Sequence, residues 1–158
     1  MTVWRIHCKT GSVLDGRKSD KELLDFFRRE NIVGIGYWLV KSRDEKVWKE
    51  LEQYPEKYLR GGRIAINAIM NVKTGDFVWF REGNNYYLFK VGDRLWKNSI
   101  PKECYEEYDV GQFVSGNWVQ VSEAIPDEII RSFYRGSIRR IRTIPANITA
   151  EIWERSNR

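Results

Sequence analysis

The stretch GDFVWFREGNNYYLFKV, residues Gly75 to Val91, decides the fold of this chain. Side chains alternate with a period of two in both halves of the stretch, which is typical of β-strands. The halves are separated by Glu82-Gly83-Asn84-Asn85, a turn signal between two such runs. Gly75-Asp76 indicates a tight turn just before the first strand, because glycine tolerates a positive φ and aspartate can accept hydrogen bonds from its own turn. We therefore predict a β-hairpin here.

Further strands and helices are predicted on both sides of this hairpin. Ser19-Asp-Lys-Glu22 is a capping box that starts a helix, Asn31 ends that helix, and Ile32 to Val40 follows as a buried strand. Other predicted strands cover residues 3–8, 94–97, 117–121 and 137–144, and other predicted helices cover 42–54, 63–72, a short stretch from 126, and 147–155. Short strands interrupted by helices indicate an α+β fold, with a curved sheet or partly open barrel flanked by helices.

The length and composition bound the class of protein. The chain has 158 residues, of which 42% are hydrophobic and 31% are charged. It contains neither a linker nor an internal repeat, so we expect one domain over residues 1–158. No apolar run approaches the ~20 residues of a membrane span, so we expect a cytoplasmic protein with no membrane partner. Cys8 and Cys104 are far apart and His7 is the only histidine, so neither a metal site nor a cofactor is expected.

The positive charge is concentrated near the C-terminal end. The formal net charge is +5, and residues 131–158 contain seven arginines and two glutamates, which account for all of it. Guanidinium groups match phosphate oxygens, so this segment favours a phosphate-facing surface. The alternative is an ordinary solvated face.

Two other stretches contain candidate ligand-binding residues. Arg17 and Lys18 precede the first predicted helix, where a phosphate of a nucleic acid could bind, although the spacing does not fit a nucleotide-binding P-loop. Gly34 and Gly36 are followed by Tyr37 and Trp38, so a flat ligand could lie over the glycines and against a ring; the alternative is that Trp38 belongs to the core. No catalytic set of side chains is visible, which favours a binding module over an enzyme.

A series of short fragments, in the right order, resembles the PUA superfamily, particularly its EVE and YTH-like branches. Trp4-Arg5-Ile6-His7 opens as the first strand of that family does, and Ile32 to Trp38 resembles its glycine-tryptophan strand. Residues 61–80 are similar to the helix and glycine-aspartate strand of EVE domains, and residues 132–141 to a late strand. The arrangement also resembles the N-terminal specificity domains of archaeal McrB-type, modification-dependent restriction proteins.

Two features depart from the EVE pattern. The Arg-Asn pair that is frequent in the third helix is absent, because Arg63 is followed by Ile64. The strand that often contains phenylalanine-tyrosine-histidine contains Trp79-Phe80-Arg81 instead.

The resemblance implies a PUA-like, non-catalytic reader of nucleic acid that binds a modified DNA base flipped out of the stack. Unstacking costs a few kcal/mol, and stacking on aromatic rings recovers about 1–3 kcal/mol per base. The implied ligand pocket consists of Ser12, Tyr37, Trp38, Asn67 and Trp79. The implied phosphate contacts are Arg17, Lys18, Arg81, Arg139, Arg140 and Arg142. The partner is then nucleic acid, and a GTP-driven motor domain would follow C-terminally in a longer protein.

Two further interpretations stay open. An RNA-binding PUA-like module would recognise shape and 2′-hydroxyl groups. A protein-interaction domain would use its aromatic residues as an interface, and its affinity for nucleic acid would depend little on salt. Either nucleic-acid reader would instead lose affinity steeply as the salt concentration rises.

Overall fold

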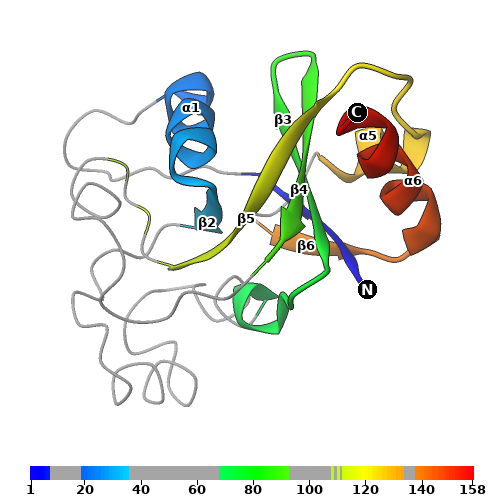
Figure 1. Cartoon of the computed structure of the whole chain (residues 1–158), viewed down its shortest axis with the longest axis horizontal. Coiled ribbons are helices and arrows are strands. Elements are labelled where there is room, and N and C mark those ends of the chain that lie inside the picture. The colour runs from blue at the N-terminus through cyan, green and yellow to red at the C-terminus, as the bar shows by residue number, and fades with distance from the viewer. Residues whose placement is uncertain (8–18, 36–67, 93–107, 109, 111, 134–137) are drawn as a thin grey trace.

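The computed structural model describes residues 1–7, 19–35, 68–92, 108, 110, 112–133 and 138–158. These residues form a mixed, curled sheet of six strands in the order β2-β5-β4-β3-β1-β6, with helices against it (Figure 1). The strands are β1 (Val3–Ile6), β2 (Ile32–Ile35), β3 (Phe77–Glu82), β4 (Asn85–Val91), β5 (Gln112–Val121) and β6 (Ile138–Ile141). The helices are α1 (Asp20–Glu30), α5 (Asp127–Ser132) and α6 (Ala146–Ser156), and residues 68–71 are also helical. The predicted α+β fold with a curved sheet is confirmed.

The predicted hairpin is confirmed as β3 and β4. Glu82 pairs with Asn85, which leaves Gly83 and Asn84 as the two-residue turn. Gly83 has φ 57, and Asn31 is the one non-glycine residue with a positive φ in the part of the chain that the structure describes. A positive φ at the first turn position alone is the signature of a type II′ turn, in which glycine is favoured.

The sheet curls where β5 changes its pairing partner. Residues 112–115 of β5 pair with β2, whereas residues 116–121 pair with β4. Gly116 lies at this change: its N–H donates to the carbonyl of Asn31, at 2.9 Å, while Lys90 and Phe89 of β4 crowd its Cα. A glycine is required here because the chain bends against a neighbouring backbone.

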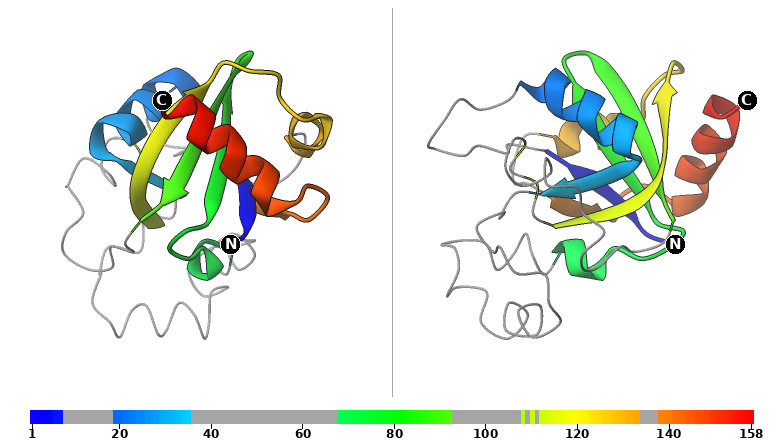
Figure 2. Two further views of the ribbon diagram at one scale, coloured as in Figure 1. Left: turned by 45° about the vertical axis from the view of Figure 1, so that its right-hand side comes forward. Right: turned by 60° about the vertical axis from the view of Figure 1, so that its left-hand side comes forward.

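Both faces of the sheet are covered. One face packs against α1 with Trp4, Val78, Phe80 and Phe89, and the other packs against α5 and α6 with the residues that alternate with them, including Trp79. Figure 2 shows α1 on one side of the strands and α6 on the other. The side chains that alternate along the hairpin therefore pack into two hydrophobic cores, one on each face of the sheet, and neither face is left exposed to solvent.

A buried carboxylate joins the N-terminal strand to the hairpin. Asp76, 4% exposed, accepts hydrogen bonds from the N–H groups of Thr2 (2.8 Å) and Lys73 (3.0 Å) and from Nε1 of Trp4 (3.0 Å). These bonds place β1 beside β3 in the parallel register that pairs Trp4 with Val78. This is the one parallel pairing among the described strands.

Several local predictions are confirmed and several fall outside the described residues. Ser19 and Glu22 form the predicted capping box of α1, and Asn31 ends that helix in the left-handed conformation. The predicted strand at 117–121 is the second half of the longer β5, and the predicted strand at 137–144 is shorter, because residues 142–145 turn into α6. The predicted elements at 42–54 and 94–97 lie outside the described residues. Among the described helices, none has the length and apolarity to cross a bilayer.

We expect Asp76→Asn to lower the free energy of unfolding by about 1–3 kcal/mol, because the amide removes the charge and turns an NH₂ group toward buried donors. Urea unfolding followed by circular dichroism measures this loss. Asp25→Asn is the matched control, since Asp25 is exposed on α1 and should change stability by less than about 0.5 kcal/mol. Equal midpoints for the two variants would show that Asp76 is not a structural anchor.

We expect Gly116→Ala to destabilise the chain by at least about 1–3 kcal/mol, the usual cost of overpacking. Its Cβ would overlap the carbonyl oxygen of Lys90 and lie 2.7 Å from Cζ of Phe89. Gly92→Ala is the control, because the nearest atom to a Cβ there is 3.5 Å away. Thermal unfolding of both variants tests the bend, and a Gly116→Ala protein as stable as Gly92→Ala would refute it.

Candidate functional site

The strand β6 lies at one end of the sheet order and carries arginine on both faces. It pairs with β1 on one side, and no other described strand pairs with it. Arg139 lies opposite Arg5 and Arg140 lies opposite Trp4, so their side chains are on opposite faces of the sheet. Both arginines are exposed. One sheet edge therefore presents positive charge in two directions.

On one face, three arginines form what we call the arginine cluster: Arg5 of β1, Arg81 of β3 and Arg139 of β6. Arg5 pairs with Trp79, and Arg81 follows two residues later on the same face. The guanidinium carbons of Arg5 and Arg81 lie 6.0 Å and 5.8 Å from the centroid of the same ring, that of Phe133. Phe133 is buried just after α5, so both guanidinium groups lie beside a ring that belongs to the core.

The environment of the cluster disfavours the charged form of its buried arginine, Arg5. Arg5 is 0% exposed, and burial lowers its pKa to about 10, with a further lowering by the charge of Arg139. A lowered pKa means that the folded chain holds the charged guanidinium at a cost. A negatively charged ligand near the cluster would favour the charged form of Arg5.

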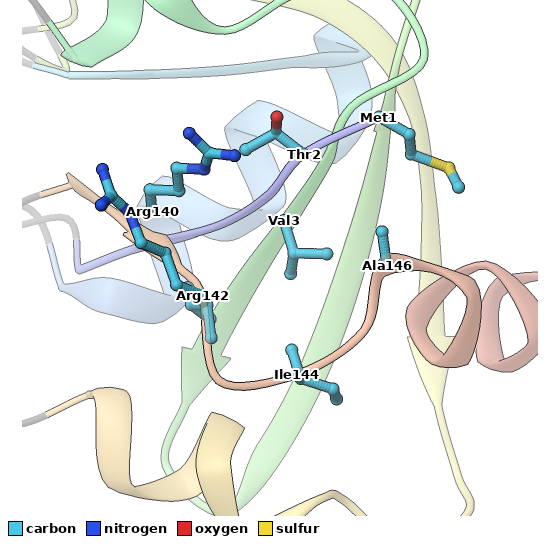
Figure 3. Close-up of a pocket in the computed structure, with 8 residues that line it drawn as sticks. Met1, Thr2, Val3, Arg140, Arg142, Ile144 and Ala146 are labelled. Carbon is cyan, nitrogen blue, oxygen red and sulfur yellow. The ribbon is translucent and has the colours of Figure 1, made fainter.

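Beside the start of β1 and the end of β6, a pocket of about 380 Å³, which we call the edge pocket, lies against the N-terminal residues. Its lining residues are Met1, Thr2, Val3, Arg140, Ile141, Arg142, Ile144 and Ala146. Figure 3 shows the side chains of Arg140 and Arg142 extending in the same direction, while Met1, Ile144 and Ala146 lie at the other end. The pocket thus has a cationic end and an apolar end, and its volume is within the range of ligand sites.

The arginines of this edge lack the ion pairs that Arg155 and Arg131 make. Arg155 donates to both carboxylate oxygens of Glu123, the shorter bond being 2.8 Å, and these hydrogen bonds hold the pKa of Glu123 below its ordinary value. Arg131 lies 3.8 Å from Asp127. In contrast, none of the carboxylates in the described ranges lies within 4.0 Å of Arg139, Arg140 or Arg142. Their charge is available to an external anion.

The sequence-predicted site residues are only partly brought together. Arg81 and Arg139 share the arginine cluster, and Arg140 and Arg142 share the edge pocket. Trp79 is 0% exposed, and its Nε1 lies 3.5 Å from Oγ1 of Thr149 in the core beneath α6. Since no ligand can stack on a fully buried ring, we do not retain Trp79 as part of a base pocket. The remaining predicted residues, Ser12, Arg17, Lys18, Tyr37, Trp38 and Asn67, lie outside the described residues.

Sequence reasoning missed Arg5 as a site residue. The only signal is an arginine inside the short strand VWRI, all four residues of which are buried. That signal shows that Arg5 is unusual, but its proximity to Arg81 and Arg139 depends on the pairing of three strands that are distant in sequence.

The described residues contain no group of His, Cys, Asp and Glu side chains that could hold a metal ion. Comparison with protein-family models and with curated protein sequences finds no match. The function is therefore inferred from the residues and their geometry.

Proposed function

We propose that this chain is a non-catalytic nucleic-acid reader of the PUA-like type, and that the β6 edge is its phosphate-binding surface. The observation that carries the proposal is the set of exposed arginines on this edge, Arg139, Arg140 and Arg142, which have no ion pair with any described carboxylate. Planar guanidinium groups bind phosphate oxygens in a bidentate manner.

Arg140 and Arg142 lie together at the edge pocket. Arg140 belongs to β6, Arg142 follows the end of that strand, and both line the pocket. Their guanidinium groups can therefore contact phosphates of one nucleic-acid strand.

The finer part of the proposal is the reading of a modified base in DNA. The curled six-stranded sheet with helices on both faces is compatible with a PUA-like architecture. With Trp79 in the core, the aromatic pocket would consist of Tyr37 and Trp38, and Ser12 or Asn67 would bind the edge of the base. In a longer McrB-type protein, a GTP-driven motor would act on the DNA that this domain selects.

We expect the double variant Arg140→Ala/Arg142→Ala to bind a DNA duplex more weakly and with a smaller salt dependence. Each lost phosphate contact should reduce the slope of log affinity against log salt by about 0.9, so the pair should reduce it by roughly 2. Fluorescence anisotropy at several salt concentrations measures both quantities.

Arg155→Ala is the control for this experiment. It removes one positive charge, but that charge is already paired with Glu123, so the salt slope should stay that of the wild type. Arg155→Ala removes one positive charge and the double variant removes two. If the salt slope changed by the same amount for each charge removed, binding would depend on the net charge of the chain and not on the β6 edge. A wild-type chain with no affinity for nucleic acid would point instead to a protein partner.

We expect a duplex with methylated adenine or cytosine to bind more tightly than the same unmodified duplex, and Trp38→Ala to remove this preference. A methyl group buried in an aromatic pocket contributes about 0.8 kcal/mol, or roughly fourfold in affinity. Competition at one salt concentration between the two duplexes and a hairpin RNA measures the preference. Tighter binding of the RNA, with no effect of methylation, would replace the DNA reader by an RNA-binding module.

A further inference from the structure

We propose that the arginine cluster is a discrete binding site for one phosphate monoester or inorganic phosphate dianion, separate from the strand-binding surface of Arg140 and Arg142. The monoester would be the terminal phosphate of a nucleic-acid strand, and this part rests on the proposed function. The binding of inorganic phosphate does not depend on it.

The first support is that three adjacent strands place three arginines on one face of the sheet. Arg139 and Arg5 are direct cross-strand partners, and Arg81 lies over the same Phe133 ring as Arg5. Like charges at directly opposite positions of a sheet destabilise it. Arginine side chains so arranged can donate several charge-assisted hydrogen bonds to one phosphoryl group.

The second support is the charge balance of this face. Neither Arg81 nor Arg139 lies within 4.0 Å of a carboxylate in the part of the chain that the structure describes. Asp127, at the start of the neighbouring helix α5, lies instead 3.8 Å from Arg131. The pKa of Arg5 is lowered, first by burial and then by the charge of Arg139, so no net negative charge acts on this arginine.

The third support is the shape of the cluster, which favours the end of a ligand over the middle of one. Phe133 is 4% exposed, and both Trp79 and Arg5 are 0% exposed, so the inner side of the cluster is closed. Arg81 and Arg139 are exposed at its outer side. A terminal phosphate can enter such a closed site, whereas a continuous strand would have to leave again on the far side.

The roles of the three arginines differ accordingly. Arg81 and Arg139, which are exposed, would contact the phosphate. Arg5 is a positioning residue, since it is buried and acts through its charge beneath the other two. Arg155 of α6, which is paired with Glu123, provides a matched control of the same residue type.

The site is tested by thermal unfolding of the full chain in increasing sodium phosphate, against sodium chloride of equal ionic strength. A ligand that binds only the folded state raises the unfolding midpoint in a saturable manner. We expect phosphate to raise the midpoint of the wild type, and Arg81→Ala or Arg139→Ala to weaken the apparent phosphate affinity about tenfold or more. Arg155→Ala should leave that affinity unchanged, because its charge is already paired with Glu123.

The variants of Arg5 separate charge from packing. Arg5→Lys keeps a positive charge and should retain most of the phosphate effect, whereas Arg5→Met should lose it. The readout is the difference between the phosphate and chloride titrations, so a general change in stability cancels. Equal midpoints of the wild type in phosphate and chloride would overturn the site. It would also be overturned if Arg155→Ala lost as much phosphate affinity as Arg139→Ala.

A second arm distinguishes the sources of the phosphate. Single-stranded DNA with a 5′-phosphate should bind about tenfold more tightly than the same strand with a 5′-hydroxyl, and inorganic phosphate should compete away the difference. Equal binding of both strands, with the phosphate titration still sensitive to Arg139→Ala, would assign free phosphate as the ligand. An intact phosphate effect with no affinity for any strand would refute the nucleic-acid function and leave the site standing.

Discussion

The carboxylate of Asp76 is the constraint on which the rest of the structure depends. It receives three hydrogen bonds from the N-terminal segment and the residues before β3, and thereby places β1 parallel to β3. Only a strand in that position can pair with β6 on its other side and bring Arg5 opposite Arg139. A buried acid immediately before β3 thus helps to determine where the basic edge of the molecule lies.

The covering of both sheet faces explains the aromatic content without a ligand, at least for the described residues. Trp4, Trp79 and Trp153 are each 7% exposed or less. Trp118 packs among Phe27, Phe80 and Phe89 and donates to the carbonyl of Ile32, which helps to hold the curl of the sheet. These four tryptophans belong to the core, so surplus aromatic residues alone are weak evidence for a stacking surface. The arginines, which the core does not need, are better evidence for a ligand.

The sequence predicted what depends on neighbouring residues and missed what depends on strand pairing. The hairpin and the Ser19 capping box were predictable because a turn and a cap are specified within a few residues. Trp79 was misassigned because period-2 alternation shows that it faces away from Phe80, but cannot show that α5 and α6 cover that side. Arg5 was missed for the same reason: its proximity to Arg81 and Arg139 depends on two long-range pairings.

A purely structural explanation exists for charge on β6, and the arginine cluster distinguishes it from ligand binding. Edge strands commonly carry charged residues because these prevent pairing with another chain, and Arg140 could serve that purpose alone. Such protection requires an exposed charge of either sign at the edge. It does not require Arg5, which is fully buried one strand further in and whose pKa is lowered by burial and by Arg139. Edge protection therefore does not explain Arg5, whereas an anion bound between Arg81 and Arg139, as we propose, would be attracted by its charge.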